Sequence, residues 1–335
     1  MSWYDSHGRH DLPWQYPRTA YRAWIAEVML QQTQVATAIP YFLRFVEKFA
    51  SLRALAEARL DDVLALWSGL GYYSRARNLH RAAQICVERH RGSLPRDFDA
   101  LAALPGIGRS TAGAILAQAH GLRFPILDGN VKRVLARHRG VRGWPGASAV
   151  QKKLWALAES HTPHERVADY TQAIMDLGAT VCARARPRCA HCPLARDCIA
   201  HRENATAQLP ERKPARALPT RETIMLLLRD RSGRILLERR PPTGVWAQLW
   251  SLPEADDVDS ARRHVGAKVE LRALTPFTHT FSHYHLDVAP MTGTVAMPRG
   301  VADAPDRRWL HPREAAALGL PAPVRKLIAS LPEEP

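Results

Sequence analysis

The chain has 335 residues, enough for about two domains that each bury a hydrophobic core. A hydrophobic content of 46% excludes a chain that is disordered throughout. The 47 Lys and Arg against 32 Asp and Glu give a net charge of +15. This charge favours a polyanionic partner, because neutralising phosphates releases condensed counterions. A basic protein that is merely soluble is the alternative.

The first residues lack the charged start and apolar run of a signal peptide. No stretch approaches the roughly 18 apolar residues of a membrane-spanning helix. We therefore expect a cytoplasmic protein without a membrane partner, in a compartment that keeps thiols reduced. Cys86 lies at helical spacing among apolar residues and is expected to be a buried core thiol.

Residues 21–160 alternate amphipathic helical stretches with short Gly/Pro breaks. One predicted helix runs through residues 24–39 and another through residues 60–67. Residues 100–120 then couple a glycine hairpin, Leu-Pro-Gly-Ile-Gly, to the start of a helix. Gly106 and Gly108 allow a sharp turn, and Ser110 or Thr111 is expected to cap the helix. Unpaired N–H groups at such a helix start can bind a phosphate, so the hairpin favours DNA-backbone binding over an ordinary turn.

A run of cysteines with the spacing C-x6-C-x2-C-x5-C follows in an arginine-rich segment. Four thiolates this close in sequence can surround a single metal centre. Zinc sites usually come as two separated C-x2-C pairs, whereas this run has one pair with long arms. The expected metal ligands are Cys182, Cys189, Cys192 and Cys198.

The amino-acid composition changes after the last of these cysteines. Residues 204–220 carry several prolines among Arg and Lys and predict a linker. Beyond it, residues 223–228, 234–238 and 277–286 predict strands. The expected architecture is therefore multidomain: an all-α domain at 1–203 with its metal-bound loop at 182–198, the linker, and a smaller α+β domain at 221–335.

The hairpin resembles that of the helix–hairpin–helix DNA glycosylases, and the cysteine spacing resembles the [4Fe–4S] loop of the endonuclease III branch. Within that branch, residues 26–35, residues 69–79 and the C-terminal strand domain resemble adenine DNA glycosylases of the MutY type. The resemblance covers essentially the whole chain. It implies one structural [4Fe–4S] cluster per chain, rather than zinc. It also implies a monomer in base excision repair that acts at the nucleoid on double-stranded DNA containing A·8-oxoguanine or A·G mispairs.

Breaking a glycosidic bond requires an acid for the leaving base and an anion for the developing sugar cation. By resemblance, Glu27 protonates adenine N7, Asp128 stabilises the sugar cation, and Asn130 is a polar organiser beside it. Apolar neighbours on a helix should raise the pKa of Glu27. A helix N-terminus should keep Asp128 ionised. Taken singly, Glu27 would be interpreted as a residue on a solvated helix face and Asp128 as a helix cap.

Base excision from a duplex also requires base flipping. By resemblance, Gln32, which follows Gln31, is an intercalating wedge. Leu70 and Tyr72 would probe beside the opposite base. Arg75 and Arg77 are candidate phosphate ligands. The resemblance also implies that Trp14 and Leu30 are walls of an adenine pocket. Gln15 stands where some relatives carry arginine.

Position 110 separates two reaction types. In endonuclease III relatives the matching residue is a lysine that forms a Schiff base and cuts the strand. Ser110 cannot form that imine, so the sequence predicts a monofunctional glycosylase. The enzymatic alternative is an oxidised-pyrimidine glycosylase/lyase. The alternative from another class is a non-catalytic mismatch-binding or cluster-sensing protein.

Residues 233–253 resemble the entry to a Nudix fold, but no Arg-Glu-x-x-Glu-Glu pattern follows to hold Mg²⁺. The domain is therefore expected to be a reader rather than a hydrolase. Strand alternation would place five residues on one face: Phe277, His279, Phe281, His283 and His285. A zinc site on this His-rich strand is not favoured, because no companion Cys or carboxylate stands nearby. The triplet Phe281, Ser282 and His283 resembles the loop that recognises 8-oxoguanine.

Overall fold

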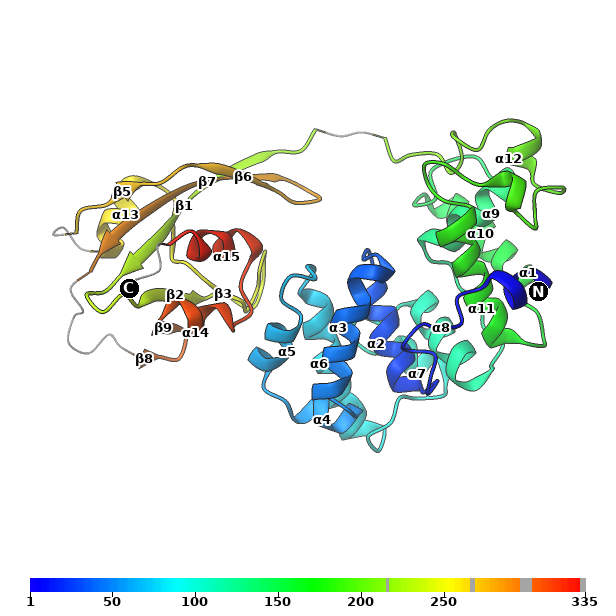
Figure 1. The fold of residues 1–335 in the computed structure, drawn as a ribbon, viewed down its shortest axis with the longest axis horizontal. Coiled ribbons are helices and arrows are strands. Elements are labelled where there is room, and N and C mark those ends of the chain that lie inside the picture. The colour runs from blue at the N-terminus through cyan, green and yellow to red at the C-terminus, as the bar shows by residue number, and fades with distance from the viewer. Residues whose placement is uncertain (215–216, 266–268, 296–302, 332–335) are drawn as a thin grey trace. The chain divides into compact units, whose positions relative to one another are not determined.

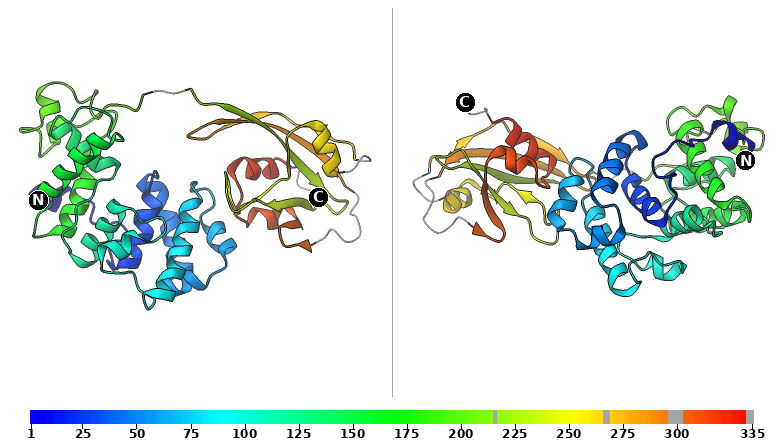
Figure 2. Two further views of the ribbon diagram at one scale, coloured as in Figure 1. Left: turned by 180° about the vertical axis from the view of Figure 1, so that it is seen from behind. Right: turned by 60° about the horizontal axis from the view of Figure 1, so that its bottom comes forward.

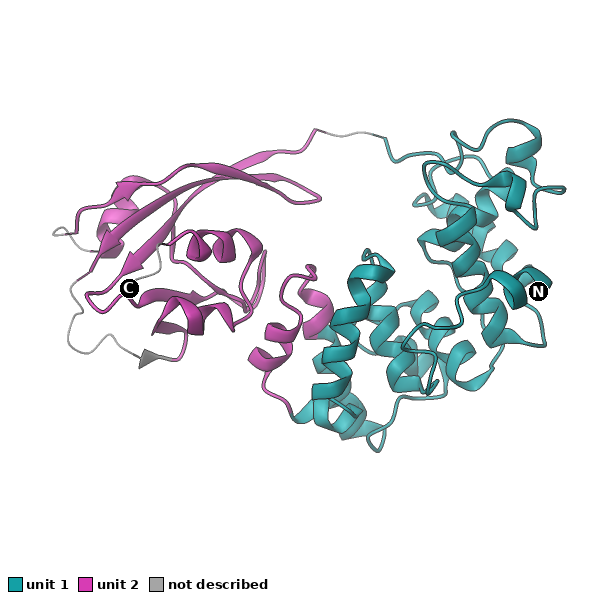
Figure 3. Cartoon of the chain, in the orientation of Figure 1, with its two compact units in different colours: residues 1–57, 78–215 teal, residues 58–77, 216–335 magenta. Residues whose placement is uncertain are grey.

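The computed structural model describes residues 1–335 except 215–216, 266–268, 296–302 and 332–335. Part of the predicted linker and parts of the predicted C-terminal domain thus lie outside the described residues. Figure 3 shows two compact units, one of residues 1–57 and 78–215 and the other of residues 58–77 and 216–335. The first is helical and the second is built on a sheet, so the predicted fold class is confirmed. Among the described residues, no helix combines the length and apolar character needed to cross a bilayer.

The helical unit is coloured blue to green in Figure 1, and Figure 2 shows it from two further sides. Its elements are α1 (Ser2–His7), α2 (Ala20–Leu30), α3 (Val35–Lys48), α4 (Leu52–Glu57), most of α6 (Ser74–Arg89), α7 (Phe98–Ala102), α8 (Arg109–His120), α9 (Gly129–His138), α10 (Ser148–His161), α11 (Val167–Asp176), the π-helical turn η1 (Leu177–Val181), the 3₁₀ turn η2 (Cys189–His191) and α12 (Ile199–Arg202). Helix α8 packs against α2 and α11 at the centre of this unit.

The single helix predicted at residues 24–39 is wrong, because the chain forms α2 and α3 with a turn between them. Thr19 caps the start of α2 by accepting a hydrogen bond from the Arg22 N–H. At the other end, the Thr33 N–H bonds to the Leu30 carbonyl at 3.2 Å. Gln32 adopts a left-handed φ of 58°, which breaks the helix and leaves its side chain exposed.

The glycine hairpin joins α7 to α8. Gly106 has a φ of +79°, and a Cβ there would lie 2.9 Å from the Cβ of Asn78, so only glycine fits without a shift. The predicted cap is wrong: α8 begins at Arg109 with Gly108 as its N-cap and no side-chain capping bond. The Ser110 hydroxyl instead accepts a hydrogen bond from the Leu127 N–H at 2.9 Å.

The second unit contains α5 (Leu60–Leu66) and a mixed sheet. Its described strands are β1 (Thr220–Arg229), β2 (Ile235–Arg239), β3 (Trp250–Ser251), β4 (Glu254–Ala255), β5 (Arg272–Ala273), β6 (Phe277–Thr280), β7 (His285–Thr294), β8 (Asp303–Ala304) and β9 (Arg307–Leu310). The main path runs β5-β7-β1-β2-β9-β8, and β1 pairs in parallel with β7.

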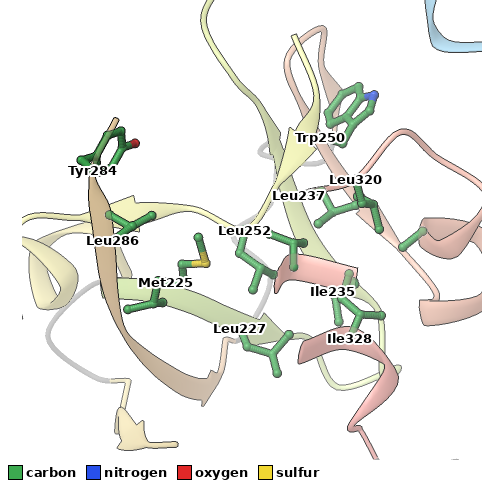
Figure 4. Packing of buried hydrophobic residues seen from close by; sticks show 13 residues of the cluster. Met225, Leu227, Ile235, Leu237, Trp250, Leu252, Tyr284, Leu286, Leu320 and Ile328 are labelled. Carbon is green, nitrogen blue, oxygen red and sulfur yellow. The ribbon is translucent and has the colours of Figure 1, made fainter. Parts of the chain in front are cut away.

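Strand β1 is central and buried on both faces, which explains its unbroken apolar run. On one face, Met225 and Leu227 pack with residues of α14 (Pro312–Ala316) and α15 (Ala322–Ala329). Figure 4 shows part of this core, with Ile328 of α15 beside strand residues. On the other face, Ile224, Leu226 and Leu228 pack with α13 (Val258–Val265).

The continuous strand predicted at residues 277–286 is wrong. The chain forms a β6–β7 hairpin, in which Thr280 pairs with His285. A backbone bond from the Phe281 N–H to the Tyr284 carbonyl, at 2.9 Å, closes the turn. The expected single face is therefore interrupted at Phe281, and Ser282 and His283 are exposed at the tip of the turn.

Candidate active site

One cavity of the helical unit brings most of the predicted site residues together. It has a volume of about 420 Å³. Its lining includes Trp14, Glu27, Leu30, Gln31, Gln32, Ser110, Asp128 and Asn130. These side chains come from the segment before α2, from α2 and the turn after it, and from the starts of α8 and α9. Two carboxyl groups therefore share one cavity with apolar and amide walls.

Glu27 projects from α2, where its neighbours Ala26 and Val28 are buried. Its Oε1 accepts a hydrogen bond from Gln118 Nε2 of α8 at 2.9 Å. Burial, and secondarily the charge of Asp128, raises the pKa of Glu27 to about 8, while the Gln118 bond opposes this rise. The Glu27 carboxyl therefore retains its proton at neutral pH, as its apolar neighbours predict.

Asp128 is the N-cap of α9, and its Oδ1 accepts a hydrogen bond from the Val131 N–H at 2.7 Å. Burial is the largest influence and raises the pKa of this carboxyl. The hydrogen bonds from Val131 and Asn130 and the charge of Arg133 act in the opposite direction. The helix N-terminus predicted to keep Asp128 ionised is present, but burial outweighs it and the net change in the pKa is upward. Of the two carboxyls, Asp128 has the environment that better accommodates a negative charge.

Asn130 is held beside Asp128 by a residue that the sequence did not single out. Arg133 Nη2 donates to Asn130 Oδ1 at 2.8 Å and to the Gly178 carbonyl at 2.7 Å. Its Nε donates to the Cys182 carbonyl at 2.7 Å. A Cβ at Gly178 would lie 2.6 Å from the Cβ of Asn130, so η1 approaches α9 closely. Arg133 thus connects the neighbourhood of Asp128 to the first cysteine of the basic loop.

Two further polar residues of the cavity were missed. Arg9 and Gln172 both line it. Each bonds the buried carboxylate of Asp176, Arg9 Nη2 at 2.6 Å and Gln172 Nε2 at 2.7 Å. Arg9 and Asp176 are 167 positions apart, so no local sequence pattern could pair them. Gln15 is buried and donates from Nε2 to the Arg9 carbonyl at 2.9 Å.

The predicted probe residues Leu70 and Tyr72 belong to the second unit. Leu70 is 7% exposed, whereas Tyr72 is 50% exposed with a left-handed φ of 49°. Tyr72 is thus the more accessible of the two. Both arginines have protein acceptors in the structure: Arg75 bonds the Leu70 and Gly71 carbonyls, and Arg77 bonds the Ala247 carbonyl.

The cysteines Cys182, Cys189, Cys192 and Cys198 line one small cavity together with Arg137. Arg137 Nη1 approaches Cys182 Sγ at 3.4 Å and also donates to the Ala183 carbonyl at 2.7 Å. Burial, and then the neighbouring Cys182 and Cys198, raises the pKa of Cys189. Among the described residues, no three His, Cys, Asp or Glu side chains form a ready-made metal site. Four thiols that line one cavity beside the Arg137 guanidinium nevertheless have the chemistry to hold a thiolate-bound cluster, whose negative charge Arg137 would offset.

Comparison with known proteins identifies both parts of the chain. Residues 25–160 match the family described as HhH-GPD superfamily base excision DNA repair protein, and residues 224–330 match the NUDIX domain. An adenine DNA glycosylase of Buchnera aphidicola is 37% identical over 98% of this chain and 95% of its own length. The adenine DNA glycosylase of Homo sapiens is 34% identical over 98% of this chain and 72% of its own length.

Among solved structures, a thermostable thymine-DNA glycosylase matches 60% of this chain and 93% of its own, with a TM-score of 0.55 and 26% identity. The helical fold, the paired carboxyls in one cavity and the near full-length similarity agree with one another. The chain belongs to the family of the adenine DNA glycosylases, enzymes of base excision DNA repair.

Proposed function

We propose that this enzyme hydrolyses the N-glycosidic bond of adenine mispaired with 8-oxoguanine or guanine in duplex DNA and leaves the strand intact. The observation that carries the proposal is the pair Glu27 and Asp128 in one cavity, where Asp128 accepts a backbone N–H at the start of α9 and Glu27 accepts the side-chain amide of Gln118. Trp14 and Leu30 supply apolar walls for a flipped base. Exposed Gln32 at the same cavity is suited to fill the space left in the duplex.

In this proposal Glu27 donates its proton to N7 of adenine as the glycosidic bond breaks, which makes the base a neutral leaving group. The carboxylate of Asp128 stabilises the positive charge that develops on the sugar, and Asn130 orients that carboxylate by its bond to Oδ2 at 3.3 Å. Glu27, now ionised, then accepts a proton from the attacking water. Ser110 has no amine to compete with water, and its hydroxyl already bonds the Leu127 N–H.

The lesion reader is proposed to be the turn of the β6–β7 hairpin. 8-Oxoguanine carries an N7–H donor and an O8 acceptor, whereas guanine has only an acceptor at N7. Ser282 and His283 are exposed there with polar side chains that can meet this pattern. The hairpin glycines Gly106 and Gly108 are exposed beside the start of α8, where backbone N–H groups can bind the DNA phosphates.

The four cysteines would hold one [4Fe–4S] cluster. When bound, the cluster supplies a structural cross-link and no redox step in base removal. It would fix the arginines of the 182–198 loop as a cationic surface for the DNA backbone. We further propose that the enzyme acts as a monomer in the cytoplasm, on DNA of the nucleoid.

Single-turnover base release tests this function on duplexes carrying A opposite 8-oxoguanine, G, T or C, each analysed with and without hot alkali. We expect strand scission only after alkali, fastest opposite 8-oxoguanine and next fastest opposite G. Scission without alkali would instead support a glycosylase/lyase. Tight binding without adenine release would support a non-catalytic mismatch-binding protein.

The pH dependence of base release should report the proton on Glu27. This proton is present below its pKa of about 8 and lost above it. The single-turnover rate should therefore be level near neutral pH and fall about tenfold for each unit above pH 8. Rates from pH 6 to 10 with enzyme in excess would measure this, with DNA binding checked at each pH. A rate that rises through pH 8 would contradict the acid role of Glu27.

A further inference from the structure

The second unit contains two segments expected to contact the opposite base, one predicted from the sequence by resemblance and the other assigned in the proposed function. One is the turn at residues 69–73 with exposed Tyr72, and the other is the β6–β7 turn with exposed Ser282 and His283. They are far apart in sequence. A continuous series of contacts joins them through α6 and the loop between β2 and β3.

The first contact fixes the 69–73 turn to the start of α6. Arg75 Nη2 donates to the Leu70 carbonyl at 3.3 Å and to the Gly71 carbonyl at 3.1 Å. The Arg75 side chain is buried, and its guanidinium lies 5.3 Å from the centre of the Trp67 ring and 5.5 Å from that of Tyr72. The conformation of the turn is therefore set by α6.

The second contact passes from α6 to the β2–β3 loop. Arg77 Nη1 donates to the Ala247 carbonyl at 2.7 Å. Ala247 is 1% exposed, and its neighbours Trp246 and Gln248 both have left-handed φ values, 56° and 60°. Non-glycine residues in this conformation persist only where surrounding contacts fix them. The Arg77 bond supplies such a contact and satisfies a buried carbonyl.

The third contact reaches the β6–β7 turn. The Trp246 ring lies 5.2 Å from the Phe281 ring and 5.5 Å from the His279 ring. The Phe281 ring in turn lies 4.8 Å from Tyr284, which is buried in the core of the unit. Aromatic pairs at these separations favour particular orientations. Trp246 therefore supports the turn from the side of the β2–β3 loop.

We propose that Arg77 and Trp246 are positioning residues that hold the two turns in a fixed relative position. The two turns then recognise the opposite base together. Neither residue needs to touch the DNA. The inference rests on the proposed function, since it assigns the coupling to the discrimination of 8-oxoguanine from guanine. Recognition groups held within a fraction of an ångström discriminate far better than groups that move independently.

A double-mutant cycle in the full-length enzyme tests the coupling. Arg77→Met removes the donor to Ala247 but keeps an apolar stem, and Trp246→Leu removes the aromatic support. The readout is the ratio of single-turnover rates on A·8-oxoguanine and A·G duplexes at saturating enzyme. We expect each variant to lower this ratio about tenfold and to leave the A·G rate nearly unchanged. The double variant should lower it no further than the stronger single variant, and Trp246→Phe should restore most of the ratio.

Arg262→Met is the matched control, because it removes the same charge from an exposed position of α13 and should leave the ratio unchanged. Thermal unfolding of each variant is measured alongside. The inference is overturned if the losses of the rate ratio in the two single variants multiply in the double variant. It is also overturned if a variant loses rate equally on both duplexes and has a lower melting temperature. If both variants keep the wild-type preference for A·8-oxoguanine over A·G, this inference is overturned and the proposed function stands. A wild-type enzyme without preference would overturn the proposed specificity and this inference with it.

Discussion

Glu27→Gln should lower the rate of adenine release by about 100- to 10,000-fold while leaving the affinity for mispaired duplex nearly unchanged. The amide keeps the size of the side chain but has no proton acidic enough for adenine N7, and general acid catalysis contributes on the order of 10²–10⁴. Single-turnover rates and equilibrium binding to the same duplex, measured side by side, would separate the two effects. Glu47→Gln, an exposed change on α3, is the control.

The same substitution should change stability in a pH-dependent direction. The pKa of Glu27 rises from 4.5 to about 8 on folding. Between these values the unfolded chain releases the proton that the folded protein retains, so the free energy of unfolding falls by up to about 1.4 kcal/mol per pH unit. The Glu27→Gln variant has no titrating group at this position and therefore lacks the penalty. We expect it to melt about 5 °C higher or more at pH 8 and nearly like the wild type below pH 4.5. Equal melting temperatures at pH 8 would argue against a Glu27 carboxyl that stays protonated in the folded protein.

Cys192→Ser should prevent binding of the proposed [4Fe–4S] cluster and disorganise residues 182–198. A serine oxygen is a poor substitute for a cluster thiolate, and the loop has few buried apolar residues of its own to hold it. We expect loss of bound iron and of its visible absorption, and at least about a tenfold loss of affinity for duplex DNA through the loop arginines. Iron and zinc analysis of the purified protein and binding at two salt concentrations would measure this.

Cys86→Ala is the matched control for this change, because Cys86 is a fully buried thiol remote in sequence from the loop. It should retain iron and bind DNA normally. A wild-type protein that is colourless and contains zinc would contradict the choice of metal. Full iron content in the Cys192→Ser variant would contradict the role of that cysteine as a ligand.

Local sequence was sufficient where the determinants are local. The glycine hairpin, the N-cap position of Asp128 and the apolar run of β1 each follow from neighbouring residues, and the structure contains them. The helical repeat across residues 24–39 was misleading, because apolar periodicity continues through a turn that depends on the left-handed φ of Gln32. Alternation likewise continued through the turn at Phe281, which a single backbone bond closes.

The parts of the site that sequence did not reveal depend on long-range contacts. Gln118 lies 91 positions from Glu27, and its bond to that carboxyl becomes visible only once α8 packs on α2. Arg133 looked like one more basic residue on a helix, although its role is set by carbonyls of Gly178 and Cys182. The bond of Arg77 to the Ala247 carbonyl joins residues 170 positions apart, so no local pattern indicates it.

The Arg9–Asp176 pair has a consequence for biosynthesis. Its partners are 167 positions apart, and both the side chain and the backbone N–H of Arg9 bond the same carboxylate. During translation the N-terminal segment leaves the ribosome long before α11 is available to receive it. The wall of the cavity formed by Arg9 and Gln172 therefore cannot be completed on a nascent chain that ends before Asp176. Completion of this cavity is a late event of synthesis, and a prematurely terminated chain of that length would lack the Arg9–Asp176 pair that holds this wall.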